Sequence, residues 1–293
     1  MDHSKRIKIG LLFLAASFGI GFLSWWQMSL IQIDDSSNIE IQANSKSDKL
    51  APIHLRPSAQ IQAGAEHPFK LASMNERTES IEDFEQRLAI FPTVFWEPLD
   101  TVSLRKLIRE TALVREKRIL EIGTGSGLVS LCCAEAKAKS VVATDVNPNA
   151  IACAQSNAKR LDVASQIDFR LVDTKNAKAF AVIKADERFD LIISNPPWEE
   201  GMPDIIDQYA LYDPNFELLK SLLGEARMHL SSDGELYLAY GCKTAIRLLQ
   251  KLSVELDYEF QVLDERKLDD LNEVFLPGML LKLKPKEPKS ITN

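Results

Sequence analysis

The stretch that decides the fold of this chain is a glycine-rich segment, Glu121-Ile122-Gly123-Thr124-Gly125-Ser126-Gly127. It follows the short apolar run Ile119–Ile122, which reads as a buried strand, and it opens a helical pattern. Glycines let a backbone turn tightly and approach a ligand closely, and a helix N-terminus offers N–H groups without intrahelical partners. The spacing is G-x-G-x-G, unlike the G-x-G-x-x-G of dinucleotide binders, and no P-loop Lys-Ser/Thr pair follows. The segment therefore predicts a ligand-binding turn between a strand and a helix.

Short apolar strands alternate with helical patterns around this turn. The predicted strands are Ile119–Ile122, Val141–Thr144, Ile167–Leu171, Leu191–Ser194, Leu236–Ala239, Phe260–Leu263 and Met279–Leu283. Such alternation is typical of βαβ units, so we expect a Rossmann-like α/β fold with a mostly parallel, seven-stranded sheet and helices on both faces. The last two strands lack a convincing helix between them, which predicts one antiparallel strand at the sheet edge.

Composition divides the chain into four expected parts. They are an N-terminal membrane anchor (1–33), a polar linker with a short helix over Ile81–Ile90 (34–90), the α/β domain (91–284) and a polar tail (285–293). Apolar spacing over Leu99–Glu116 predicts an amphipathic helix at the start of the α/β domain.

The membrane anchor is predicted from Ile9–Ile33, a run of 25 residues without a charged side chain. This run is long enough to span a bilayer with some tilt. A cleaved signal peptide is the alternative, although the run is longer than a usual signal-peptide core and no clean A-x-A cleavage site follows it.

The charge and the cysteines weigh against some functional classes. The net charge of −7 gives no basic field over the whole protein, which disfavours a nucleic-acid partner. The four cysteines, Cys132, Cys133, Cys153 and Cys242, show neither a CxxC pair nor the spacing of a zinc site. We therefore predict buried thiols, with no metal site and no disulfide framework.

Two acidic residues follow predicted strands. Asp145 ends the second strand, 20 residues after Gly125, where a carboxylate can accept both hydroxyls of a ribose. Its alternative role is to cap the helix that starts at Pro148, but Asn147 suits that position. Asp173 ends the third strand, where it would either accept from an adenine amino group or cap the next helix.

The fourth strand ends in Asn195-Pro196-Pro197-Trp198. Two prolines stop a strand abruptly, and a residue before proline is held in extended geometry. Asn195 is thus expected in a fixed pose beside an aromatic ring, an arrangement suited to a planar amide or amino group. The alternative is a proline-rich turn with an incidental asparagine.

Together these motifs resemble the class I S-adenosylmethionine-dependent methyltransferases, in the small-domain and HemK-like branch that carries an (N/D)-PP-(Y/F/W) element. The resemblance runs from about Phe91 to Leu283. It implies S-adenosylmethionine as the cofactor, with Asp145 at the ribose and Asp173 at the adenine. The residues implied around the methionine part are those of the glycine turn, Glu121, Gly123, Thr124, Gly125 and Gly127. It also implies that the methyl acceptor is held by Asn195, Pro196, Pro197 and Trp198. In this family the asparagine side chain and the carbonyl of the first proline accept hydrogen bonds from the nitrogen that is methylated. The aromatic ring stacks on the plane of the methyl acceptor.

Two further segments bear on the acceptor. Phe91–Pro98 occupies the place of a loop over the cofactor, so Phe95 or Trp96 is expected either in a lid or in a hydrophobic staple at a helix start. Trp198–Phe216 contains five acidic residues and no Lys or Arg, and such a segment would repel a phosphate backbone. Tyr209 and Tyr212 would add aromatic contacts.

We therefore expect a methyltransferase that N-methylates a planar amide or amino group of a protein glutamine or a small molecule. The alternatives are an adenine-N6 or guanine-N2 methyltransferase acting on RNA or DNA, and a non-catalytic binding module with this fold. Lys5, Arg6 and Lys8 precede the apolar run, and positive residues there predict export of the domain that follows. Because the cofactor is made in the cytosol, we instead expect a single-pass anchor with a cytosolic catalytic domain.

Overall fold

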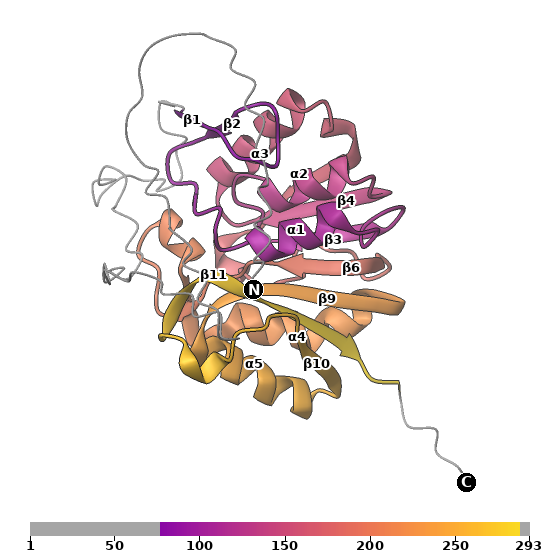
Figure 1. Cartoon of the computed structure of the whole chain (residues 1–293), viewed down its shortest axis with the longest axis vertical. Coiled ribbons are helices and arrows are strands. Elements are labelled where there is room, and N and C mark those ends of the chain that lie inside the picture. Colours follow the sequence, from indigo (N-terminus) through magenta and orange to yellow (C-terminus); the bar gives the residue numbers. More distant parts are fainter. Residues whose placement is uncertain (1–76, 288–293) are drawn as a thin grey trace, which may run out of the picture. The chain divides into compact units, whose positions relative to one another are not determined.

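The computed structural model describes residues 77–287, and a seven-stranded β-sheet between helical layers forms its core (Figure 1). The strands occur in the spatial order β10-β11-β9-β6-β3-β4-β5. Their bounds are β3 (Arg118–Ile122), β4 (Ser140–Asp145), β5 (Ile167–Leu171), β6 (Phe189–Ser194), β9 (Leu230–Cys242), β10 (Tyr258–Val262) and β11 (Val274–Pro285). The predicted Rossmann-like sheet is confirmed.

The position of the antiparallel strand differs from the prediction. β11 is antiparallel to both of its neighbours, β9 and β10, whereas all other pairs in this sheet are parallel. The predicted edge position was wrong, because β10 lies at the edge and β11 is inserted beside it. A connection of residues 263–273 without an α-helix returns the chain antiparallel to β10, and the buried side chains of Leu281 and Leu283 favour an interior strand.

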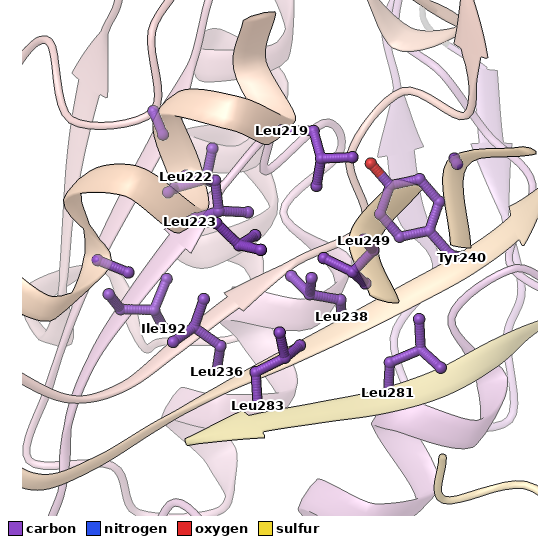
Figure 2. Packing of buried hydrophobic residues seen from close by; sticks show 14 of the residues in the cluster. Ile192, Leu219, Leu222, Leu223, Leu236, Leu238, Tyr240, Leu249, Leu281 and Leu283 are labelled. Atoms are coloured by element: carbon purple, nitrogen blue, oxygen red, sulfur yellow. The ribbon is translucent and has the colours of Figure 1, made fainter. Parts of the chain in front are cut away.

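Within the described residues, five α-helices cover the sheet: α1 (Val102–Glu110), α2 (Leu128–Glu135), α3 (Pro148–Arg160), α4 (Glu217–His229) and α5 (Lys243–Glu255). Alternate residues of each strand point to opposite faces, so the sheet has two cores. Ile192 belongs to the core under α4 and α5, where Figure 2 shows leucines of both helices packed over β6, β9 and β11. Its neighbour Ile193 belongs to the other core, with side chains of α1 and α2. The amphipathic helix predicted over Leu99–Glu116 is confirmed in a shorter form, α1.

A short hairpin precedes the sheet domain. β1 (Arg77–Glu79) and β2 (Leu88–Ile90) pair antiparallel. The short helix predicted over Ile81–Ile90 does not form, because all three residues of β2 are buried and tertiary bonds hold its backbone. The Asn157 side chain of α3 accepts from Ala89 N at 2.7 Å and donates to Ala89 O at 2.9 Å. It also donates to Ser126 O at 3.0 Å, which ties the hairpin to the glycine turn.

The predicted membrane anchor, Ile9–Ile33, lies outside the described residues, as does most of the predicted linker and tail. Within residues 77–287, no helix is both long and apolar enough to cross a bilayer.

Candidate functional site

A cavity of about 440 Å³ opens where β3, β4, β5 and β6 end. Carboxyl ends of parallel strands meet at one edge of a sheet, which is where ligands bind in open α/β folds. Residues from the glycine turn, the β4–α3 connection, the segment after β5 and the segment after β6 line it together. The sequence motifs predicted as binding elements therefore converge on one cavity.

The glycine turn takes a shape that other residues adopt only with strain. Gly123, Gly125 and Gly127 have φ values of 78°, 55° and 87°. The N–H groups of Gly123 and Thr124 both donate to Thr144 O at 2.9 Å, which fixes the turn to β4. Gly123 and Gly125 line the cavity, but Gly127 does not. A Cβ at Gly127 would lie 2.9 Å from Ala154 Cβ, so this glycine permits close packing of α2 on α3.

Asp145 is hydrogen-bonded both to the glycine turn and to its own turn between β4 and α3. Its Oδ2 accepts from Gly125 N and its Oδ1 accepts from Asn147 N, each at 2.8 Å. Burial raises the pKa of its carboxyl. The α3 cap is Asn147, as the sequence indicates, since its side chain accepts from Asn149 N. Asp145 thus orders the glycine turn while lining the cavity.

Glu121 is a buried carboxyl on the cavity wall. It accepts from Thr124 Oγ1 at 2.6 Å, from Ser130 N at 3.2 Å and from the Ser130 hydroxyl. Burial raises its pKa to about 7, although these bonds lower it. A cationic group entering the cavity would favour its ionised form.

Asp173 lies apart from these residues. It is exposed, and its Oδ1 accepts from Lys175 N at 2.9 Å, which caps the short 3-10 helix η2 (Thr174–Asn176). Its neighbours Val172 and Thr174 line the cavity, whereas Asp173 is not among the lining residues. The structure shows the capping contact of Asp173, and its adenine contact stays a prediction.

Asn195 lines the same cavity as the glycine turn, together with Pro197. Its Nδ2 donates to Asp100 Oδ2 at 2.7 Å, and its Oδ1 accepts from Trp198 Nε1 at 3.0 Å. Pro196 and Trp198 line a small adjoining cavity of about 20 Å³.

The Trp198 ring is partly buried against the core under α4 and α5. It lies against the backbone of Gly241, where a Cβ would overlap the indole. The aromatic rings that line the larger cavity instead are Phe95, Trp96, Tyr209 and Tyr212.

The structure adds Asp100, which the sequence reasoning missed. It is 3% exposed, precedes α1 and lines both cavities. Burial raises its pKa to about 7, against the lowering effect of its bond to Asn195. An acid just before an amphipathic helix reads as an ordinary helix start, so only the long-range contact with Asn195 distinguishes it.

The segment Phe91–Pro98 contributes Phe95 and Trp96 to the cavity wall, as expected for a loop over a cofactor. Side chains at the start of α3 hold its backbone. Asn147 Nδ2 donates to Thr93 O at 2.8 Å, and Asn149 Nδ2 donates to Pro92 O at 3.1 Å.

The acidic segment after Trp198 also lines the cavity. It contains the two-residue parallel strands β7 (Glu199–Glu200) and β8 (Tyr212–Asp213). Asp213 caps α4 by accepting from Leu218 N and Leu219 N at 2.9 and 3.0 Å, and both Asp213 and Asp207 are buried and line the cavity. Among the described lining residues, the cationic side chains are Lys175 and Lys178, both after β5.

The profile of the methyltransferase small domain matches residues 92–261. The chain belongs to this family. The match begins within Phe91–Pro98 and ends in β10, so the methyltransferase small domain includes the glycine turn, Asp145 and Asn195.

Curated relatives agree with the methyltransferase small domain assignment. The release factor glutamine methyltransferase of Cereibacter sphaeroides is 34% identical over 135 residues, which cover 42% of this chain and 46% of the relative. The release factor glutamine methyltransferase of Koribacter versatilis is 29% identical over 178 residues, which cover 56% of this chain and 61% of the relative. The chain thus spans about half the length of the curated relatives it matches.

Solved structures share the fold of this methyltransferase small domain. The 16S rRNA N2 G1207 methyltransferase of T. thermophilus, in complex with AdoMet and guanosine, is 18% identical with a TM-score of 0.51, over 73% of this chain and 51% of that one. A SAM-dependent methyltransferase of Agrobacterium tumefaciens is 17% identical with a TM-score of 0.51, over 72% and 70%. S-adenosylmethionine is the cofactor of this class.

Proposed function

We propose that this chain transfers a methyl group from S-adenosylmethionine to a planar amide or amino nitrogen, with the side-chain amide of a protein glutamine as its acceptor. One observation carries the proposal: Asn195 and Pro197 line the same cavity as the glycine turn and Asp145. A cofactor bound to the turn would thus share an enclosed space with the acceptor. Bringing two reactants together in the correct orientation supplies a large part of the rate of such a displacement.

The chemistry of the cavity wall suits this cofactor. When bound, S-adenosylmethionine supplies an activated methyl group on a cationic sulfur. Gly123, Thr124 and Gly125 give a turn with room for close approach, and Asp145 offers carboxylate oxygens for ribose hydroxyls. Ionised Glu121 would stabilise the cationic methionine part of the cofactor. Gly127 would act by letting α2 approach α3. For Asp173 we propose an indirect role at the adenine end, since its carboxylate caps the turn that carries the lining residues Val172 and Thr174.

The acceptor end suits a nitrogen with a delocalised lone pair. Protein groups that accept hydrogen bonds from the N–H groups of such a nitrogen favour its pyramidal, nucleophilic form, which develops near the transition state. Asn195 Oδ1 has one lone pair engaged by Trp198 Nε1–H and a second for the methyl acceptor. The Pro196 carbonyl is the second acceptor implied by the family. Trp198 would hold Asn195 in place through its indole N–H, and Phe95 or Tyr209 would offer the aromatic ring that contacts the methyl acceptor.

A protein glutamine is favoured over a nucleic-acid base for two reasons. The curated relatives are named for glutamine methylation of release factors. In addition, Asp207, Glu217 and Asp100 line the cavity, and carboxylates at this wall repel phosphate groups.

The direct test is methyl transfer from tritiated S-adenosylmethionine to a purified release factor, using the full-length chain. Asn195→Ala should lower kcat at least a hundredfold, on the order of 3 kcal/mol, while the cofactor Kd measured by calorimetry changes less than threefold. Asn272→Ala is the matched control, since Asn272 is exposed and belongs to neither set of lining residues. Absence of cofactor binding by the wild-type chain would overturn the proposal.

A structured RNA offered in parallel tests the alternative acceptor. Lys175 and Lys178 at the β5 side of the cavity are the feature that would favour a nucleic acid. Label in the RNA but not in the release factor would replace glutamine with an adenine-N6 or guanine-N2 acceptor. Cofactor binding without label in either would support a binding module.

We further propose that Ile9–Ile33 anchors the chain in a membrane with the catalytic domain in the cytosol. The support is the uncharged length of this run. An impermeant thiol reagent added to intact cells should not label a cysteine engineered at Ser47, in the segment after the run. Extraction of the chain by alkaline carbonate would exclude a spanning anchor.

A further inference from the structure

A chain of three side chains joins the segment before α1 to the motif after β6. Asp100 Oδ2 accepts from Asn195 Nδ2 at 2.7 Å, and Asn195 Oδ1 accepts from Trp198 Nε1 at 3.0 Å. An indole N–H only donates and a carboxylate only accepts, so these partners permit one orientation of the Asn195 amide. A flipped amide would place an NH2 group against the indole N–H and an oxygen against the carboxylate.

Packing holds both ends of this chain in place. The Trp198 ring lies against Gly241 on β9, and the carbonyl oxygen of Asp100 lies against Gly278 on β11, where neither position has room for a Cβ. Asp100 is 3% exposed, so water does not compete freely for its carboxylate. The amide of Asn195 is thus held from two sides by groups that belong to different elements.

We propose that Asp100 is a positioning residue for methyl transfer: its carboxylate fixes the Asn195 amide and strengthens Oδ1 as the acceptor for the substrate N–H. This inference rests on the proposed function of Asn195. A hydrogen bond from an amide N–H to an anion draws electron density toward the amide oxygen, because hydrogen bonds in series polarise one another. A neutral Asp100 would hold the same geometry with a weaker effect on Oδ1.

The charges around Asp100 make this polarisation dependent on pH near neutrality. The pKa of Asp100 is raised to about 7, mainly by burial; the bond to Asn195 lowers it and the nearby Glu97 raises it. On the β6 side Asp100 meets the uncharged Asn195. On the α1 side Arg105 donates to Pro98 O and Thr101 Oγ1 and is paired with Asp83. On the β11 side Arg266 donates to Gly278 O and is paired with Asp264.

The indole N–H of Trp198 reports on this chain without any substrate. We would label the full-length chain with ¹⁵N-tryptophan and follow its indole resonances from pH 5.5 to 8.5. The chain has four tryptophans, and Trp198→Phe assigns the relevant resonance. The Trp198 proton resonance should move downfield as pH rises, with a midpoint near 7, because a charged Asp100 strengthens the bond to Oδ1.

Two variants give matched comparisons. Asp100→Asn keeps an acceptor for Asn195 Nδ2 but cannot ionise, so the resonance should become independent of pH. Glu97→Gln removes the nearby charge that raises the pKa of Asp100, so the midpoint should move to lower pH. A wild-type resonance without this titration, or a titration that persists in Asp100→Asn, would overturn the inference. The Glu97→Gln comparison remains decisive even if Asp100→Asn fails to fold.

The catalytic consequence is tested with the release factor and tritiated S-adenosylmethionine. Asp100→Asn should lower kcat at least tenfold, remove the rise of kcat through pH 7 and leave the cofactor Kd within threefold. An unchanged kcat would restrict Asp100 to a structural role. If the wild-type chain labels no acceptor, the proposed function fails, whereas the resonance experiment still decides whether Asp100 controls Asn195.

Discussion

The indole ring of Trp198 lies directly against the backbone of Gly241, so that a Cβ atom at position 241 would overlap the ring. Trp198 in turn donates to Asn195. A glycine on β9 therefore determines where the acceptor motif after β6 can sit.

Gly241→Ala should displace Trp198 and disturb Asn195. Overpacking of this kind costs about 1–3 kcal/mol, so urea unfolding should show a lower free energy, and methyl transfer should fall at least tenfold. Gly224→Ala is the matched control, because a Cβ at this α4 glycine meets nothing within 4 Å. It should leave activity unchanged and raise stability by up to about 1 kcal/mol. Equal effects of the two substitutions would contradict the packing relationship.

Asp145→Ala should weaken cofactor binding at least thirtyfold by calorimetry. The substitution removes the ribose acceptor and also frees Gly125 N and Asn147 N, which the carboxylate orders. Asp173→Ala provides the comparison, since Asp173 is exposed and its carboxylate accepts from Lys175 N in its own turn. We expect less than a threefold change in Kd for that variant; a loss as large as that of Asp145→Ala would restore the adenine contact of Asp173 predicted from sequence.

Stability should depend on pH through Glu121. Its pKa is raised from 4.5 to about 7 in the folded chain, so the folded state binds a proton more tightly than the unfolded state. The free energy of unfolding should therefore fall as pH rises from about 4.5 to 7, by on the order of 3 kcal/mol, and level off above 7. Asp100, whose pKa is also raised to about 7, adds a fall in the same direction, so Glu121→Gln should make the total fall smaller by the share of Glu121. Urea titrations at pH 5 and 7.5 measure it, and an identical pH response in both proteins would contradict the assignment.

Cofactor affinity should change with pH in the opposite direction. The cationic cofactor favours ionised Glu121, and below pH 7 binding must first release its proton. As the pH falls from 7 to 5.5, the Kd for S-adenosylmethionine should increase, with a slope that approaches about tenfold per pH unit. Calorimetry on Glu121→Gln should show weaker binding with a flat profile over this range. A wild-type Kd that stays constant there would mean that Glu121 does not face the cationic part of the cofactor.

Local patterns predicted most of the sheet because its strands are apolar runs followed by turn residues. The glycine turn and Asp145 were predictable for the same reason: each follows a strand, and parallel strands bring such positions to one edge. The antiparallel strand was predicted at the wrong position because strand order depends on contacts between distant segments, and β11 pairs with both β9 and β10. The helix predicted over Ile81–Ile90 does not form because β2 is buried and its backbone is hydrogen-bonded to Asn157.

The acceptor end was less predictable because its contacts are distant in sequence. Asp100 and Asn195 are 95 residues apart, and the ring position of Trp198 depends on Gly241 and Gly278. The identity of Asn195 as a constrained residue follows from the prolines after it, but the group that constrains its side chain does not.

The bonds of Asn157 have a consequence for how the chain opens. One side chain bonds the backbone of β2 and the glycine turn, so opening of the hairpin leaves a buried amide unsatisfied beside the turn. The two segments should open together as one cooperative unit. In hydrogen exchange, the Ala89 amide and those of the glycine turn would then share one rate of opening, and a ligand on the turn would slow exchange in a hairpin that it does not touch.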